Sequence, residues 1–60
     1  MNGLFKSGDG NLYSDDGSNV AVINNQDGTY STTIAGEEID HDTDLNEMLE
    51  RQKLRVDEDN

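Results

Sequence analysis

The stretch from Glu37 to Glu50 constrains the fold of this chain more than any other part of its sequence. It contains seven acidic residues and no Lys or Arg; the acids are Glu37, Glu38, Asp40, Asp42, Asp44, Glu47 and Glu50. Charged side chains that lack partners are almost never fully buried. We therefore expect these carboxylates to form surface in whatever fold the chain adopts.

The length of the chain, sixty residues without Cys, predicts one small domain over residues 1–60 that has no disulfide support. A domain of this size buries only roughly 60% of the surface that its unfolded chain exposes, which leaves it marginally stable. The apolar residues suffice for one thin core between a small sheet and a helix. A homodimer, a larger partner or a bound ion could supply further stability.

Short strands are expected at residues 4–6, 11–14, 20–23 and 29–34. The third of these, VAVI, is the most β-prone run in the chain and is the expected central strand. The sequence NNQDG that follows it is typical of a hairpin loop, with Gly available for a left-handed position. Residues 37–42 stay open between an extended edge strand and a loop.

A C-terminal helix is expected over residues 43–55, with Asp42 or Thr43 as its N-cap. Glu47 and Arg51 have the i,i+4 spacing of a helical ion pair. The apolar residues that fall near one face of this helix are Leu45, Met48, Leu49 and Val56. The predicted fold class is therefore α+β, a small antiparallel β-sheet of three or four strands packed against one C-terminal helix. Residues 57–60 are expected to fray.

Metal and catalytic motifs are weak in this sequence. An oxygen-rich calcium turn could use Asp9, Asn11, Asp15 and Asp16. A calcium loop of the EF-hand type that started at Asp9 would fail at its fifth, sixth and twelfth positions, which are Tyr13, Ser14 and Val20. His41 is the only His and is expected to be an exposed loop residue, and no nucleophile elbow or phosphate-binding loop is present. We therefore expect no enzyme and no cofactor.

The net charge of −10 indicates which partners the protein has. Each phosphate contact needs a cation, and only four Lys and Arg are present, so direct binding to nucleic acid or to an anionic membrane is disfavoured. No apolar run near the N-terminus is long enough for a signal peptide or a membrane span, so a cytoplasmic protein is expected. The expected partner is a basic protein surface. The alternative is that the acidity only maintains solubility.

The acidic stretch also has a spacing that suits a basic surface. If residues 38–44 are extended, the four acids Glu38, Asp40, Asp42 and Asp44 point to one side at intervals of about 6.6 Å, twice the rise of a strand. This interval is comparable with the step between phosphates along a nucleic-acid strand. If the segment is helical, Asp40, Asp44 and Glu47 share one face instead. Capping explains part of the acid in the helix, which leaves Glu37, Glu38, Asp40 and Asp42 without a structural role.

Small size, a start like that of a complete short reading frame, strong acidity, absence of Cys and a few strands with one helix resemble the phage-encoded inhibitors of host defence. These include anti-CRISPR, anti-restriction and DNA-glycosylase inhibitor proteins. The resemblance lies in composition over the whole chain and not in a motif. It implies a DNA mimic that binds the basic DNA or RNA site of a host nucleoprotein or nuclease complex through residues 37–50, without catalysis, in the host cytoplasm.

A second hypothesis is a small phage-type structural, assembly or regulatory protein. It would bind its partner through an apolar sheet face or an apolar stripe of the helix. Substitution of Val22 or Met48 by Asp would then matter more than a change in the acids.

Overall fold

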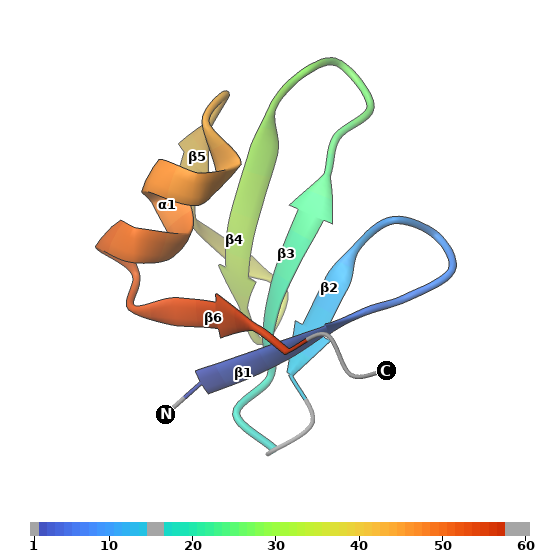
Figure 1. Ribbon diagram of the computed structural model, residues 1–60, viewed down its shortest axis with the longest axis vertical. Coiled ribbons are helices and arrows are strands. Elements are labelled where there is room, and N and C mark those ends of the chain that lie inside the picture. Colours follow the sequence, from blue (N-terminus) through green and yellow to red (C-terminus); the bar gives the residue numbers. More distant parts are fainter. Residues whose placement is uncertain (1, 15–16, 58–60) are drawn as a thin grey trace.

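The computed structural model describes residues 2–14 and 17–57, which form an α+β fold (Figure 1). The six strands of this part of the chain are β1 (Asn2–Lys6), β2 (Leu12–Ser14), β3 (Val20–Asn24), β4 (Tyr30–Ile34), β5 (Glu37–Asp42) and β6 (Leu54–Val56). Its one helix is α1 (Leu45–Arg51), which lies between β5 and β6 along the chain. In the described part of the chain, no helix has the length and apolar character needed to cross a membrane.

The six strands form one sheet in the order β5-β4-β3-β2-β1-β6. All neighbours are antiparallel except β1 and β6, which are parallel. The predicted hairpin is confirmed, because β3 pairs with β4 from Val20 opposite Ile34 to Asn24 opposite Tyr30. Its loop is closed by the Asn25 N–H, which donates to the Thr29 carbonyl at 3.0 Å, and Gly28 takes the left-handed conformation with φ 92°.

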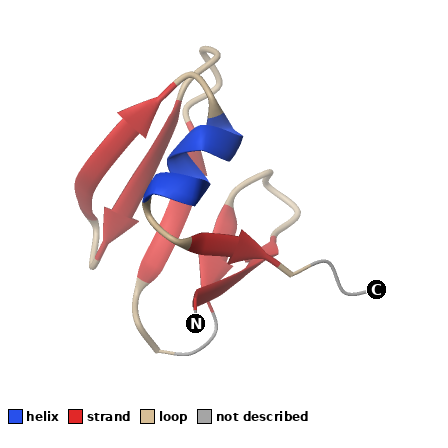
Figure 2. Ribbon diagram, turned by 60° about the vertical axis from the view of Figure 1, so that its left-hand side comes forward, coloured by secondary structure: helices blue, strands red, loops and turns tan. Residues whose placement is uncertain are grey.

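Figure 2 shows α1 against one face of the sheet, and the core lies between the two. The sheet and the helix each contribute buried side chains, which are Leu4, Leu12, Val20, Val22, Met48 and Leu49. Because α1 follows one edge strand, β5, and precedes the other, β6, a single short helix is connected to both edges of the sheet. The predicted thin core between a small sheet and a helix is therefore present.

Three parts of the predicted fold are wrong: the sheet of three or four strands, its wholly antiparallel pairing, and the helix over 43–55. The helix ends at Arg51, and Lys53 takes a left-handed conformation with φ 57°, which turns the chain. The next residues form β6, which pairs with β1 from Asn2 opposite Leu54 to Leu4 opposite Val56. In this position Leu54 and Val56 pack against the core and the edge of β1 is covered, which a longer helix would not achieve.

The predicted frayed tail begins with a residue that is held in place. The Asp57 N–H donates to the Leu4 carbonyl at 2.7 Å, so the main chain is still bonded to β1 just after β6. The remainder of that prediction concerns residues 58–60, which lie outside the described residues.

Residues 37–42, for which strand and loop were both open, form the edge strand β5. A tight turn at Ala35 and Gly36 leads into it, with φ of 54° and 83°. A bulge separates the pair Thr32–Asp40 from the pair Thr33–Glu38. One step along β4 therefore corresponds to two steps along β5. As a result, Glu38 and Asp40, two residues apart in one strand, point to opposite faces of the sheet instead of to the same face.

Thr32 is a buried residue whose replacement is expected to stabilise the protein. It is 1% exposed, and its hydroxyl has no hydrogen-bond partner among the residues that the structure describes. An unpaired buried hydroxyl costs free energy that an apolar isostere avoids, so Thr32→Val should raise the free energy of unfolding by about 1 kcal/mol in urea denaturation. Thr33→Val, on the opposite face, should change it by less than about 0.5 kcal/mol. A loss of stability in Thr32→Val would mean that the hydroxyl has a partner, such as buried water.

Candidate functional site

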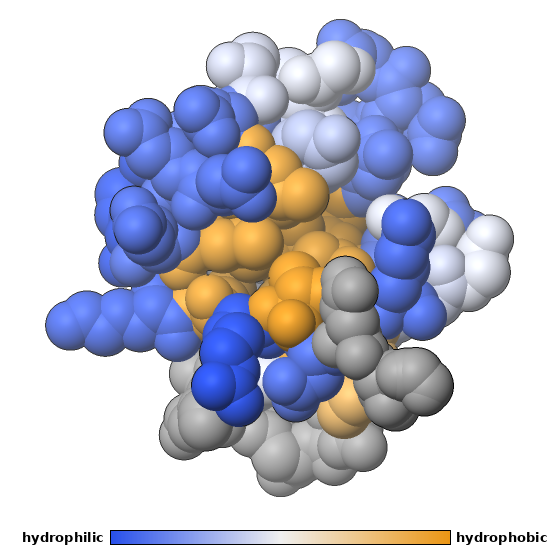
Figure 3. Space-filling model, in the orientation of Figure 1, coloured by the Kyte–Doolittle hydropathy of each residue, from blue (hydrophilic) through white to orange (hydrophobic). Residues whose placement is uncertain are grey.

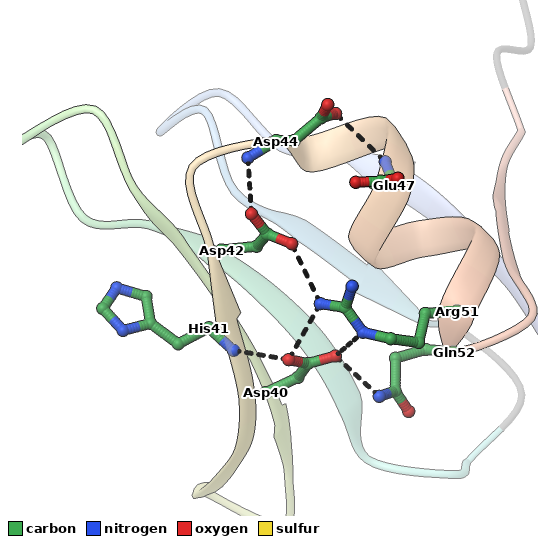
Figure 4. A network of polar contacts seen from close by, with 7 residues as sticks. All are labelled: Asp40, His41, Asp42, Asp44, Glu47, Arg51 and Gln52. Atoms are coloured by element: carbon green, nitrogen blue, oxygen red, sulfur yellow. Dashed lines mark hydrogen bonds and ion pairs between the residues drawn. The ribbon is translucent and has the colours of Figure 1, made fainter.

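Arg51 lies at the centre of a network that joins the end of α1 to β5 (Figure 4). Its Nε is 2.9 Å from Asp40 Oδ2, and its Nη2 is 3.0 Å from both Asp40 Oδ1 and Asp42 Oδ2. Gln52 also donates to Asp40 Oδ2, at 2.8 Å. We call Asp40, Asp42, Arg51 and Gln52 the clamp. It holds the end of the helix against the edge strand of the sheet.

The bulge in β5 makes the clamp possible. Cross-strand neighbours point to the same face of a sheet, so Asp40 shares the face of Thr32, which is the face that α1 covers. Glu38 shares the opposite face with Thr33, and its Oε2 is 3.9 Å from Nδ1 of His41 there. The predicted row of acids on one side of an extended segment is therefore wrong, because Glu38 and Asp40 face opposite ways.

Asp40 and Asp42 were expected to have no structural role, and that prediction is also wrong. Their side chains are only 15% and 23% exposed in the clamp. Hydrogen bonds from Arg51, and then from Gln52, hold the pKa of Asp40 well below its usual range. The backbone N–H of Asp44, and then Arg51, lower the pKa of Asp42. Hydrogen bonds from within the protein therefore already stabilise the charge of both carboxylates.

Arg51 is a residue of this network for which the sequence predicted a different partner. Its predicted ion pair was with Glu47 along the helix, whereas its guanidinium binds two acids on β5. The guanidinium presents several N–H donors in a planar fork. Hydrogen bonds from this fork to two carboxylates are more favourable than one exposed ion pair along a helix. The sequence contained one signal for this pairing: Arg51 is the first cation after a run of seven acids, so several carboxylates compete for it.

The other acids of the stretch stay exposed. Glu37 and Glu38 begin β5, whereas Glu47 and Glu50 lie on α1. Asp44 is the N-cap of the helix, in place of the predicted Asp42 or Thr43, and accepts from the Glu47 N–H at 3.1 Å. Within residues 2–14 and 17–57, none of these carboxylates forms an ion pair with Lys or Arg. We call this set the acidic rim: Glu37, Glu38, Asp44, Glu47 and Glu50.

The weak calcium candidate lies partly in the turn between β1 and β2. The carboxylate of Asp9 accepts from Ser7 Oγ at 2.6 Å, from the Asn11 N–H at 2.9 Å and from the Tyr13 hydroxyl at 3.2 Å. These bonds, the one from Ser7 first, lower the pKa of Asp9. Asn11 Oδ1 accepts from the Asn24 N–H at 2.8 Å. Both residues therefore shape the turn.

The remaining calcium candidates, Asp15 and Asp16, lie outside the described residues. Among the residues that are described, no group of three or more His, Cys, Asp or Glu is placed to hold a metal ion. His41, expected in a loop, lies in β5, and its side chain is 52% exposed.

A prediction on stability follows from the clamp. The folded-state pKa values of Asp40 and Asp42 are depressed, so their contribution to stability is complete above the unfolded pKa of about 3.9 and is lost as pH falls through the folded-state values. Arg51→Met should therefore lower the Tm clearly at neutral pH. The difference in Tm from the unmodified protein should shrink as the pH falls below about 3.9.

Lys53→Met is the matched control for this experiment, because it removes one cation that forms no ion pair within the described part of the chain. Its effect on the Tm should be small at every pH. A difference between Arg51→Met and the unmodified protein that is the same at all pH values would contradict the clamp.

Comparisons of the chain with protein-family models, with curated proteins and with solved structures find no significant match.

Proposed function

We propose that this protein is a non-catalytic inhibitor that mimics nucleic acid. In this proposal the acidic rim docks on Lys and Arg side chains in the DNA- or RNA-binding site of a partner protein and blocks access to that site. A CRISPR effector, a restriction enzyme or a DNA-repair enzyme would be such a partner, and the encounter would take place in the cytoplasm of the host cell.

The observation that supports this proposal is that both Arg side chains form ion pairs with carboxylates outside the acidic rim. Arg51 is held by Asp40 and Asp42, and Arg55 lies 3.6 Å from a carboxylate oxygen of Asp57. The acidic rim keeps its charge exposed beside this internal pairing, at a net charge of −10. Like charges that are close together repel and destabilise a small fold, and a basic partner would relieve that repulsion.

The rim supports the proposal through its charge and not through a regular spacing. The bulge and the clamp remove Asp40 and Asp42 from the predicted phosphate-like row. What remains is a group of exposed Glu side chains and one capping Asp on two adjoining elements. Such a group favours fast, salt-sensitive association, because charge steering is screened over about 8 Å at physiological salt.

Capture from a bacterial lysate tests the proposal. The immobilised protein should retain a basic nucleic-acid-binding protein at low salt and release it at high salt. Duplex DNA should displace that partner, because both compete for one site, whereas uncharged dextran should not. Retention of a partner that DNA and salt fail to displace would contradict a mimic.

A second candidate function is favoured by the uncovered face of the sheet. Phe5 and Tyr13 are cross-strand neighbours there and are 38% and 40% exposed. The row continues through Ala21 to Thr33. This face suits a structural or assembly protein, and a partner lost in Tyr13→Asp but kept in a rim variant would support it. The earlier test with Val22→Asp or Met48→Asp does not discriminate, because both residues are buried in the core.

A further inference from the structure

An apolar hollow is open on the core side of the sheet because α1 is too short to cover it. Its floor is formed by side chains from four strands and from the start of the helix, namely Leu12, Val22, Tyr30, Leu45 and Val56. Figure 3 shows this hydrophobic surface between α1 and the turn that joins β1 to β2. Tyr30, Leu45 and Val56 are only partly buried, so they present apolar area to solvent.

A shallow groove between α1 and β6 continues from this hollow. The two depressions share Asn46 and Val56 in their walls. Leu49 and Leu54 add apolar side chains to the groove. The continuous surface therefore runs from the centre of the sheet, past the exposed side of the helix, to the edge strand β6.

The carboxylates along this surface lie on the side of the helix. Three residues of the acidic rim, Asp44, Glu47 and Glu50, line the groove on the helix side. Lys6, on β1, lines the hollow. Arg55 also lines the groove, where its guanidinium is near Asp57. A segment that occupies this surface would therefore meet negative charge along α1 and an apolar floor beside it.

We propose that this hollow and groove bind a basic amphipathic segment of the partner, with one large apolar side chain inserted beside Leu45 and Val56 and with Lys or Arg placed against Asp44, Glu47 and Glu50. This inference rests on the proposed function and gives its partner a second feature besides positive charge. Charge would steer the encounter, and the apolar anchor would slow dissociation. A second copy of this chain is a poor occupant, because it has the same net charge of −10.

A pair of synthetic peptides tests the anchor separately from the charge. Both peptides have Lys and Arg on either side of a central residue, which is Trp in one and Ala in the other. The protein has no Trp, so the indole emission reports only on the peptide. The Trp peptide should bind at least about tenfold more tightly than the Ala peptide and its emission should shift to the blue, because a large apolar side chain gains free energy when it is buried.

Two matched variants locate the anchor. Asn46→Tyr places a larger side chain at the junction of the hollow and the groove; because Asn46 is exposed, the fold should tolerate this change. It should abolish the difference between the peptides. Thr33→Tyr adds the same side chain to the other face of the sheet and should leave the difference unchanged. Amide spectra of both variants establish that they are folded.

The possible results separate this inference from the proposed function. Equal, salt-sensitive binding of both peptides would overturn the anchor and leave the charge-based proposal standing. If neither peptide binds at low salt, both the anchor and the charge-based proposal are overturned. A preference for Trp that Thr33→Tyr removes would place the contact on the uncovered face, and a dimer that Asn46→Tyr dissociates would make a second copy the occupant. Either of these two results would also overturn the inference.

Discussion

Glu50→Lys is expected to weaken binding to the captured basic partner by about a hundredfold at low salt, because a like-charge contact replaces an attractive one. Glu50 is exposed near the end of α1, where a cation also complements the helix carbonyls, so the fold should tolerate this change. Most of the loss should appear in the association rate, which surface plasmon resonance measures at several salt concentrations.

The control for Glu50→Lys changes the net charge by the same amount at other places. Asn19→Lys together with Gln26→Lys adds two positive charges on exposed loops, and neither residue lines the hollow or the groove. This double variant should bind within about threefold of the unmodified protein, because screening limits the reach of distant charges. Equal losses in the two variants would show that net charge, and not the position of the rim, governs binding.

Met48→Ala is expected to remove much of the stability of the fold. Met48 is completely buried and lies between the helix and the sheet in the core. Truncation of such a side chain costs about 2 to 5 kcal/mol, whereas a domain of this length has roughly 3 to 9 kcal/mol in total. Urea denaturation followed by circular dichroism should show a large decrease in the midpoint.

Ile39→Ala is the comparison for Met48→Ala. Ile39 is 46% exposed on the edge strand, so its truncation should cost less than about 0.5 kcal/mol. Similar costs for the two substitutions would contradict the packing of α1 on the sheet.

The local pattern of the sequence was sufficient to predict the β3–β4 hairpin. β-branched residues are frequent on both sides of a loop that contains Asp and Gly, and the interactions that define the hairpin lie close together in the sequence. The start of the helix was also predicted to within two residues, from its acids and apolar spacing. The α+β class follows from these two elements.

The end of the chain could not be predicted in the same way. Leu54 and Val56 are two residues apart, which suits a strand, yet Val56 also falls near the apolar face of a helix that starts at Leu45. The choice is made by pairing with β1, which lies some fifty residues away in the sequence. Contacts at such a distance leave no local signal.

The sequence predicted which acids belong to the candidate site, but not that they divide into the acidic rim and the clamp. The bulge between β4 and β5 inserts one residue, and nothing in the sequence around Ile39 indicates it. That single insertion turns Asp40 towards the helix and leaves Glu38 on the other face. Five of the seven predicted partner-binding acids therefore remain exposed as the rim, whereas two belong to the clamp.

The most direct test of this division measures stability and partner binding on two variants of equal charge. Asp40→Asn with Asp42→Asn alters the clamp, and Glu47→Gln with Glu50→Gln alters the rim; each removes two negative charges. We expect the clamp variant to lower the Tm and to associate with the captured partner at nearly the unmodified rate. We expect the rim variant to keep its Tm and to associate about tenfold more slowly. Slower association in the clamp variant, to the same degree as in the rim variant, would contradict the account.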